Sequence, residues 1–436
     1  MKNRFLIITF SLTASLLTSC QPDTEALFDQ PAAERMNESL RIYRELLTTQ
    51  TNGWLVEYYP ERTQKYGGFN LYFRFDGNNT TVQSEINPAV AATSTWSMGS
   101  DMGPTINFDT YNTVLHYFSD PELNQGGGRG LNYEGDYEFY VESGSENEFI
   151  LRGKKTKNII RMTPMPANIS WNEYSGALRQ MSQNVIAPAY KMTVGNSEIS
   201  IVKGFRTNSF TLKSANETVS APFIVTLNGI KFYEPVTIAN ETFQFFTFND
   251  ADDKIVSTAG NAEITFTPVT LSNYFIDVLE MTAWYFKTDD IGQGYRTAWN
   301  TAKSGLENYN FRLAFMCLGK LDSDFPTGIN VGVWDEEEGV VWWSVYAYDF
   351  ATPSGNQVRM NYNSERTGAD GINANYFAPL LQGFTINAFN GRTFTLQTDV
   401  DMSNPKNMAQ ISEFTLIDGA NQNNWVKLGL EETLWP

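Results

Sequence analysis

The chain has 436 residues, 42% of them hydrophobic and 14% aromatic, and its formal net charge is −18 at pH 7. A surface this acidic repels phosphate groups, so we predict that it binds neither nucleic acid nor anionic lipid headgroups. The single histidine, His116, and the two cysteines are too few for a multi-histidine or zinc-cluster centre. No glycine-rich nucleotide fingerprint follows a predicted strand. We therefore predict no metal site and no cofactor.

The first residues are typical of a secretory signal. Lys2 and Arg4 precede an apolar segment of 13 residues, Phe5–Leu17, which is shorter than the roughly 20 residues of a membrane-spanning helix. The segment ends in "LTSC", which matches the bacterial lipobox of an aliphatic residue, two small residues and a cysteine. We therefore predict that residues 1–19 are removed, that Cys20 is lipidated, and that lipid alone attaches the protein to a membrane.

The predicted mature chain has 417 residues and a formal charge of −20, because Lys2 and Arg4 lie in the removed segment. An acylated Cys20 has no free thiol, so Cys317 has no disulfide partner and is interpreted as a small buried hydrophobic residue. Residues 20–27 form a short polar tether that contains Asp23 and Glu25.

A helix is predicted directly after the tether, with Asp29 as its N-cap and Pro31 in its first turn. Its apolar side chains recur at spacings of three and four, and Asn52-Gly53 ends it. From Trp54 the period changes to two, and short strands are expected every 8–12 residues. They include 92–98, 114–118, 133–141, 148–152 and 158–162, whereas "NQGGGRG" at 124–130 is interpreted as a loop.

Prolines before residue 170 mark a boundary, followed by a short helix over 170–181 and β-rich sequence over 190–268. "LSNYFIDVLE" and "GYRTAWNTAKSGLEN" are predicted to be helical. Strands are then expected in "FRLAFMCLG", "GINVGVW", "VVWWSVYAYDF", "QVRMNYN", "FTINAFNGRTFTLQTD" and "ISEFTLID".

These elements predict a mainly β protein with a few short helices, built from antiparallel barrels or sandwiches. The first domain, 28–168, is expected to be a lipocalin-like or open barrel preceded by one helix. A middle β-rich region follows at 169–285, and a β-sandwich-like part occupies 286–436.

One cluster, "GVWDEEEGVVWW", combines acids with tryptophans at a predicted hairpin turn. The candidate ligand-binding residues are Trp334, Asp335, Glu337, Trp342 and Trp343, which could form an acidic rim and an aromatic platform for a sugar ring or a cation. Neighbouring residues on a strand face opposite sides, so at most one of Trp342 and Trp343 reaches such a platform. The alternative is a solvated hairpin tip that protects a sheet edge.

No catalytic residue is assigned. A nucleophilic triad would have to recruit His116, which is interpreted instead as a packed or hydrogen-bonded residue on a strand. A pair of carboxylates could still perform glycoside hydrolysis, because that chemistry needs only two well-placed acids.

Several segments carry a family resemblance: "LFDQPAAERMNE", "NGWLVEYYPE", "YGGFNLYFRFD", "FDTYNTVLHYFSDP" and "LRGKKTKNIIRMTP". Together they resemble a family of Bacteroidetes lipoproteins of unknown function that accompany starch-utilisation-type transporter pairs. The resemblance implies a role in the cell envelope beside importers of glycans or peptides. It transfers one position, Cys20, as the lipid attachment site. Acids after the cysteine resemble a surface-export signal, which Asp23 and Glu25 fit loosely.

Three functions remain open from the sequence. The leading hypothesis is a non-enzymatic outer-membrane lipoprotein, exposed at the cell surface, that captures a glycan or peptide or supports a transporter complex. The alternatives are a carboxylate-dependent glycoside hydrolase and a purely structural envelope protein. A concave groove lined by exposed Trp or Tyr would favour binding, and two facing acids ~5–10 Å apart would favour hydrolysis.

Overall fold

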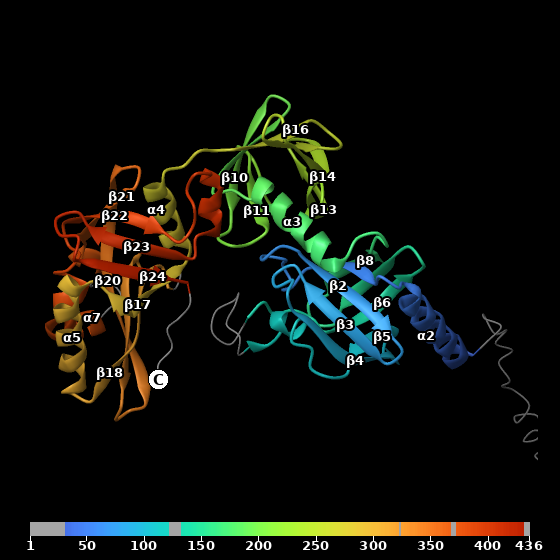
Figure 1. The fold of residues 1–436 in the computed structure, drawn as a ribbon, viewed down its shortest axis with the longest axis horizontal. Helices are drawn as coiled ribbons and strands as arrows, with labels where there is room; N and C mark the ends of the chain where they lie inside the picture. The colour runs from blue at the N-terminus through green and yellow to red at the C-terminus, as the bar shows by residue number, and fades with distance from the viewer. Residues whose placement is uncertain (1–30, 122–131, 322–323, 368–371, 431–436) are drawn as a thin grey trace, which may run out of the picture.

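A computed structural model describes residues 31–121, 132–321, 324–367 and 372–430. The strands form three closed antiparallel barrels of eight strands each, in chain order, and the second barrel lies at the top of an arch between the other two (Figure 1). The predicted mainly β, antiparallel architecture is therefore confirmed. The C-terminal sheet also closes into a barrel, where a sandwich-like arrangement was expected. Alternation of apolar and polar residues cannot separate the two, because either sheet buries one face.

Among the described residues, one helix precedes the first barrel, as predicted. The elements are α2 (Ala32–Thr49), β1 (Trp54–Tyr58), β2 (Phe69–Asp76), β3 (Asn79–Ser84), β4 (Ala91–Ser100), β5 (Pro104–Phe108), the 3-10 helix η1 (His116–Phe118), β6 (Glu138–Gly144), β7 (Phe149–Gly153) and β8 (Ile159–Pro164). Leu47 of α2 is fully buried, and its carbonyl accepts a hydrogen bond of 3.0 Å from Trp54 Nε1. The predicted cap Asp29 and the loop 124–130 lie outside the described residues.

The predicted strand at 114–118 is wrong, because His116 begins the 3-10 helix η1. The Asn112 side chain accepts hydrogen bonds from the backbone nitrogens of Val114 and Leu115, which starts a helical turn and prevents an extended strand. His116 Nδ1 lies 3.1 Å from the Asn112 nitrogen, and its ring is 4.8 Å from that of Tyr137. The histidine is thus packed and hydrogen-bonded, as expected.

The second barrel follows a helix with a complete capping box, in which Ser170 and Glu173 satisfy each other's backbone nitrogens. Its elements are α3 (Trp171–Val185), β9 (Tyr190–Val194), β10 (Ser197–Lys203), β11 (Ser209–Lys213), β12 (Thr218–Thr226), β13 (Gly229–Ile238), β14 (Glu241–Asn249), β15 (Lys254–Ser257) and β16 (Ala262–Phe266). Strand β9 pairs with β16 and closes this barrel.

The third barrel carries more helices than the other two. Its elements are α4 (Leu271–Met281), β17 (Ala283–Ile291), α5 (Gln293–Glu307), β18 (Phe311–Gly319), β19 (Gly328–Asp335), β20 (Val340–Ser354), β21 (Gln357–Tyr362), α6 (Ser364–Thr367), α7 (Ile372–Thr385), β22 (Arg392–Thr398), the 3-10 helix η3 (Pro405–Gln410), β23 (Glu413–Asp418) and β24 (Trp425–Gly429). Helices α5 and α7 lie side by side on this barrel (Figure 1). Cys317 is buried in β18, as expected.

The strand expected over "FTINAFNGRTFTLQTD" begins only at Arg392. Phe384 and Thr385 instead end α7, which was not predicted. Phe384 is fully buried in the core, and the Thr385 carbonyl accepts a hydrogen bond of 2.6 Å from the buried Tyr348 hydroxyl. Tertiary packing therefore fixes the helix end where local alternation suggested a strand.

The first and second barrels are joined by direct backbone contacts. Gly68 N donates to the Phe223 carbonyl (2.9 Å), and Asn208 N donates to the Tyr66 carbonyl (2.9 Å). A Cβ atom on Gly67 would lie 2.0 Å from the Asn208 oxygen, so this approach requires glycine. Lys231 and Glu57 add an ion pair of 2.7 Å with both side chains largely shielded from water.

The second and third barrels meet through fewer groups. The ring of Phe205, in the β10–β11 turn, lies 5.6 Å from that of Trp284 in β17. From η3, Lys406 Nζ donates to the Asn184 carbonyl (2.9 Å) and lies 3.5 Å from the centre of the Phe266 ring. A small pocket separates the two barrels beside these contacts.

Candidate functional site

The tryptophan-rich cluster predicted from sequence lies at the tip of the β19–β20 hairpin, where Trp334 pairs with Val341 and Asp335 with Val340. Trp342 is 36% exposed and Trp343 is 41% exposed. Trp343 packs edge-to-face on Phe315 of β18, with ring centres 5.1 Å apart. Both indoles thus reach solvent near the end of the barrel.

The acids of this hairpin hold its turn together. Asp335 accepts hydrogen bonds from Trp342 Nε1 (3.1 Å) and from the backbone nitrogens of Glu337 (2.9 Å) and Glu338 (3.1 Å). The Trp342 bond, followed by the backbone bonds, lowers the pKa of the Asp335 carboxyl. Glu337 itself accepts from Asn310 Nδ2 at 3.0 Å. The structure brings the predicted residues together, but their polar atoms form hydrogen bonds that stabilise the hairpin turn.

A larger hollow lies on the outer face of the third barrel and was not singled out from the sequence. Its volume is about 750 Å³, and it crosses strands β21 to β24. We call it the groove and define it by its lining residues: Gln357, Thr395, Gln397, Glu413, Thr415, Ile417, Asp418, Gly419, Gln422, Trp425 and Lys427.

Strand register explains why these side chains share one face. Residues two apart on a strand point to the same side of a sheet. Thr395 is paired with Ile417 and Ile417 with Trp425, so three neighbouring strands each place a groove residue in one row. The next row is formed by Gln397, Thr415 and Lys427.

Neutral hydrogen-bonding groups dominate the groove. Within the residues that the structure describes, the side chains of Gln397, Thr415 and Gln422 form no hydrogen bond. Amides and hydroxyls both donate and accept, as sugar hydroxyls do. Trp425 adds a partly exposed aromatic surface to this polar floor.

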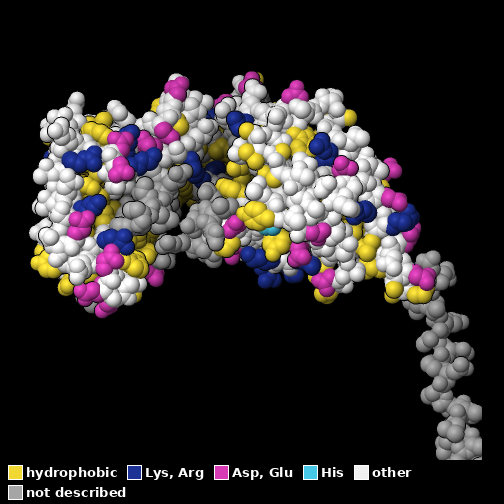
Figure 2. All heavy atoms as spheres, turned by 60° about the horizontal axis from the view of Figure 1, so that its bottom comes forward, with side chains coloured by type: hydrophobic (Ala, Val, Ile, Leu, Met, Phe, Trp, Pro, Cys, Tyr) yellow, Lys and Arg dark blue, Asp and Glu magenta, His cyan; other side chains and the backbone are white. Residues whose placement is uncertain are grey.

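The charged groups of the groove are arranged as ion pairs. Glu413 lies 2.6 Å from Lys287 and 3.5 Å from Lys427, and Lys427 also pairs with Asp290 at 2.7 Å. The hydrogen bond to Asp290 is the largest contribution that raises the pKa of Lys427. Asp418 is buried and pairs with Arg392 at 2.6 Å. Figure 2 shows acidic and basic side chains interleaved over the visible face of the third barrel, at the left of the view.

Two features are not found among the described residues. Within residues 31–121, 132–321, 324–367 and 372–430, no three His, Cys, Asp or Glu side chains are grouped closely enough to hold a metal ion. In the same ranges, no helix combines the length and the apolar character needed to cross a membrane. The predicted lipidation site Cys20 lies outside the described residues.

The sequence contained a weak signal for the groove. The segments "RTFTLQT", "EFTLID" and "WVKLG" each alternate buried apolar residues with polar or amphipathic ones. Alternation shows that each strand has a polar face. It does not show that these three strands are neighbours, so the groove could not be assembled from the sequence.

The fold and the groove define a three-barrel β protein with a polar, partly aromatic surface site. The chain belongs to the family described as a domain of unknown function (DUF4302), whose model matches residues 24–250. That match covers the leading helix, the first barrel and the second barrel as far as the end of β14, so the groove lies outside it. No curated protein matches the chain.

Proposed function

We propose that this protein is a non-enzymatic outer-membrane lipoprotein that captures a glycan in the groove of its third barrel. The single observation that carries the proposal is the set of groove side chains without a hydrogen bond, Gln397, Thr415 and Gln422, in the same groove as Trp425. Sugar rings present apolar C–H faces and many hydroxyl groups, which suit an aromatic ring flanked by groups that donate and accept.

The closed barrels favour a glycan over an extended peptide. Peptides commonly bind by adding a strand to an exposed sheet edge. Each strand of the three barrels is already paired on both sides, so that mode has no template here.

The ion pairs of the groove argue against glycoside hydrolysis. A hydrolase needs one carboxylic acid that keeps its proton and a second carboxylate free to attack or to activate water. Glu413 and Asp418 are instead engaged in ion pairs with Lys287 and Arg392, so neither carboxylate is free to act on a substrate.

The cell-envelope part of the proposal rests on the lipobox at Cys20 and on the resemblance to lipoproteins beside starch-utilisation-type transporters. In this role the tether at residues 20–27 would place the barrels at the cell surface next to transporter components. Mass spectrometry of the mature N-terminus and protease shaving of intact cells test the anchor and its membrane face. An unmodified Cys20 would remove this part of the proposal.

Calorimetric titration against a glycan panel tests the groove. We expect Trp425→Ala to weaken binding at least tenfold, and Gln397→Ala several-fold, since each removes a contact with the sugar. Trp342→Ala is the matched control, because it removes an exposed indole from the same barrel outside the groove.

The other outcomes separate the alternatives. Loss of binding in Trp342→Ala but not in Trp425→Ala would transfer the site to the hairpin tip. Hydrolysis of a polysaccharide that Glu413→Gln abolishes would favour the hydrolase. A failure of every glycan to bind, with a membrane-integrity defect on deletion, would favour a structural envelope protein.

A further inference from the structure

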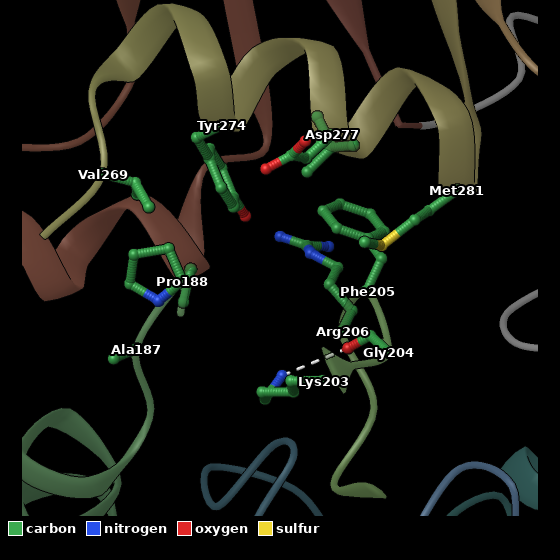
Figure 3. A pocket seen from close by; sticks show the side chains of 12 residues that line it. Ala187, Pro188, Lys203, Gly204, Phe205, Arg206, Val269, Tyr274, Asp277 and Met281 are labelled. Carbon is green, nitrogen blue, oxygen red and sulfur yellow. Dashed lines mark hydrogen bonds between the residues drawn. The ribbon is translucent and has the colours of Figure 1, made fainter. Parts of the chain in front are cut away.

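A second pocket lies between the second and third barrels, away from the strands that form the groove. Its walls come from β10 and the turn that follows it, from the α3–β9 connection, from α4 and from η3. We call it the junction pocket; its polar lining residues are Lys203, Arg206, Tyr274 and Asp277. Figure 3 shows Arg206 reaching from the turn towards α4, where the Tyr274 hydroxyl points to it.

Three of these side chains are hydrogen-bond donors with capacity to spare. Lys203 Nζ donates to the Gly204 carbonyl at 3.3 Å, which uses one of its three hydrogens (Figure 3). Within the described part of the chain, neither Lys203 nor Arg206 forms an ion pair, and the Tyr274 hydroxyl makes no hydrogen bond. Burial raises the pKa of Tyr274, so its hydroxyl keeps its proton and can donate.

Two cations without an ion pair line this pocket in a chain whose net charge is −18; Arg206 is exposed to solvent, whereas Lys203 is partly buried. Burial lowers the pKa of Lys203 to about 8, so loss of hydration is not offset by an acidic partner. An anion placed in the pocket would supply that missing partner.

The negative charge of Asp277 limits which anions the junction pocket can bind. Partial loss of hydration at the pocket wall raises the pKa of its carboxyl, and when ionised it adds one negative charge beside the cations. A doubly charged phosphate would suffer more repulsion from Asp277 than a singly charged group. The two cations and the phenol therefore suit a monoanion.

We propose that the junction pocket binds the carboxylate group of a small ligand, held by Lys203, Arg206 and the Tyr274 hydroxyl. This site is separate from the groove and does not depend on glycan capture there. A carboxylate of this kind could belong to a uronic acid or to an amino acid, and the probes below distinguish the two.

The test uses the complete mature protein and calorimetry or NMR titration with sodium glucuronate, alanine, glucose and inorganic phosphate. We expect glucuronate or alanine to bind at least tenfold more tightly than glucose. Binding of glucuronate alone identifies an acidic sugar, and binding of alanine alone identifies an amino acid. Carboxylates that bind no better than glucose, or phosphate that binds as tightly as they do, would overturn the proposal.

Variants locate the site. Lys203→Met and Arg206→Gln should each reduce carboxylate affinity at least tenfold, whereas Lys213→Met, an exposed lysine on β11, should stay within twofold. Trp425→Ala should leave the affinity for alanine unchanged, because an amino acid has no sugar ring to stack on Trp425 in the groove. An unchanged affinity in folded Arg206→Gln protein, as judged by circular dichroism, would contradict the assignment.

The pH profile supplies an independent readout. The ionisable groups that face the pocket are Lys203 and Arg206 from the second barrel and Tyr274 and Asp277 from α4, while the lining residues from the α3–β9 connection and η3 are uncharged. Affinity should fall as the pH rises from about 7 to about 9, because Lys203 loses its proton. Lys203→Arg should keep its affinity over that range. The same fall in both proteins would count against Lys203.

Discussion

The two junctions of the molecule differ in how they are built. Between the first and second barrels, backbone groups bond directly, Asn70 Nδ2 donates to the Val225 carbonyl at 3.0 Å, and the fully buried Tyr72 of β2 packs within the core of the second barrel. Between the second and third barrels, the contacts include Phe205 against Trp284 and Lys406, which reaches the Asn184 carbonyl and pairs with Asp253, beside an open pocket.

This difference indicates that the first two barrels form one structural body and that the third is attached to it. The family match follows the same division in part, since it covers the first barrel and most of the second and none of the third. Buried backbone bonds and aromatic packing couple two units strongly, whereas a few side chains over a hollow interface couple them weakly. We therefore expect two unfolding transitions, one for the first two barrels together and one for the third.

The largest effect should come from Tyr72→Ala at the first junction. Tyr72 is fully buried, its ring stacks on Trp171 with centres 5.7 Å apart, and its hydroxyl accepts a hydrogen bond of 2.9 Å from Ser175 Oγ. Truncation should lower the free energy of unfolding of the two-barrel body by about 3–5 kcal/mol, measured by urea denaturation. Tyr72→Phe should cost only about 1 kcal/mol. Separate transitions for the first and second barrels would refute the single-body interpretation.

A pH-dependent effect is expected at Glu85, which also lies near the first junction. Burial raises the pKa of Glu85 to about 7 from the ordinary value of 4.5, against hydrogen bonds from Asn70. The folded state therefore holds the proton more tightly than the unfolded state, and stability falls as the pH rises from 4.5 to about 7.

The substitution Glu85→Gln should remove this fall in stability with rising pH, because glutamine does not ionise. Relative to the parent protein, the variant should gain about 1–3 kcal/mol in free energy of unfolding between pH 4.5 and pH 8. Denaturation series at both pH values measure the gain, with the exposed Glu146→Gln as the control. A difference between variant and parent that does not change with pH would contradict the raised pKa.

At the second junction, Phe205→Ala should have a smaller and more local effect. Phe205 is only partly buried, so we expect the variant to lose about 1–2 kcal/mol of free energy of unfolding. The loss should be confined to the unfolding transition of the third barrel. Small-angle scattering should show a wider range of positions of the third barrel relative to the other two. A loss spread equally over both transitions would mean that the three barrels unfold as one unit.

The smallest effect is expected for Asp335→Ala at the hairpin tip. The variant loses the three hydrogen bonds that close the turn, of which two come from backbone nitrogens. These hydrogen bonds are solvent-exposed, so the free energy of unfolding of the third barrel should fall by only about 1 kcal/mol. Calorimetry of the variant should show an unchanged unfolding transition for the two-barrel body. A shift in the temperature of that transition would argue against independent unfolding.

Much of the fold could be predicted from local patterns. Period-two alternation identified the β architecture, and α4 and α5 lie where helices were predicted. Errors arose where tertiary contacts decide. The side chain of Asn112 converts the expected strand around His116 into a 3-10 helix, and the buried Phe384 keeps an apolar segment helical.

The candidate sites show the same limit. The cluster from Trp334 to Trp343 is contiguous along the chain, so its residue types alone make it recognisable. The groove joins residues from Gln357 to Lys427 across four strands, and the junction pocket joins Lys203 to Asp277 across two barrels. Such assemblies depend on which strands and domains become neighbours, which composition and spacing do not specify.

Closure of the barrels affects how copies of the protein can contact one another. An open sheet presents a row of free N–H and C=O groups along its outermost strand, onto which a strand from another molecule can be added. In the part of the chain that the structure describes, all three sheets wrap back onto their first strand and leave no such row. Copies that meet at high concentration could therefore touch side by side without templating fibrils, and their net negative charge would add mutual repulsion.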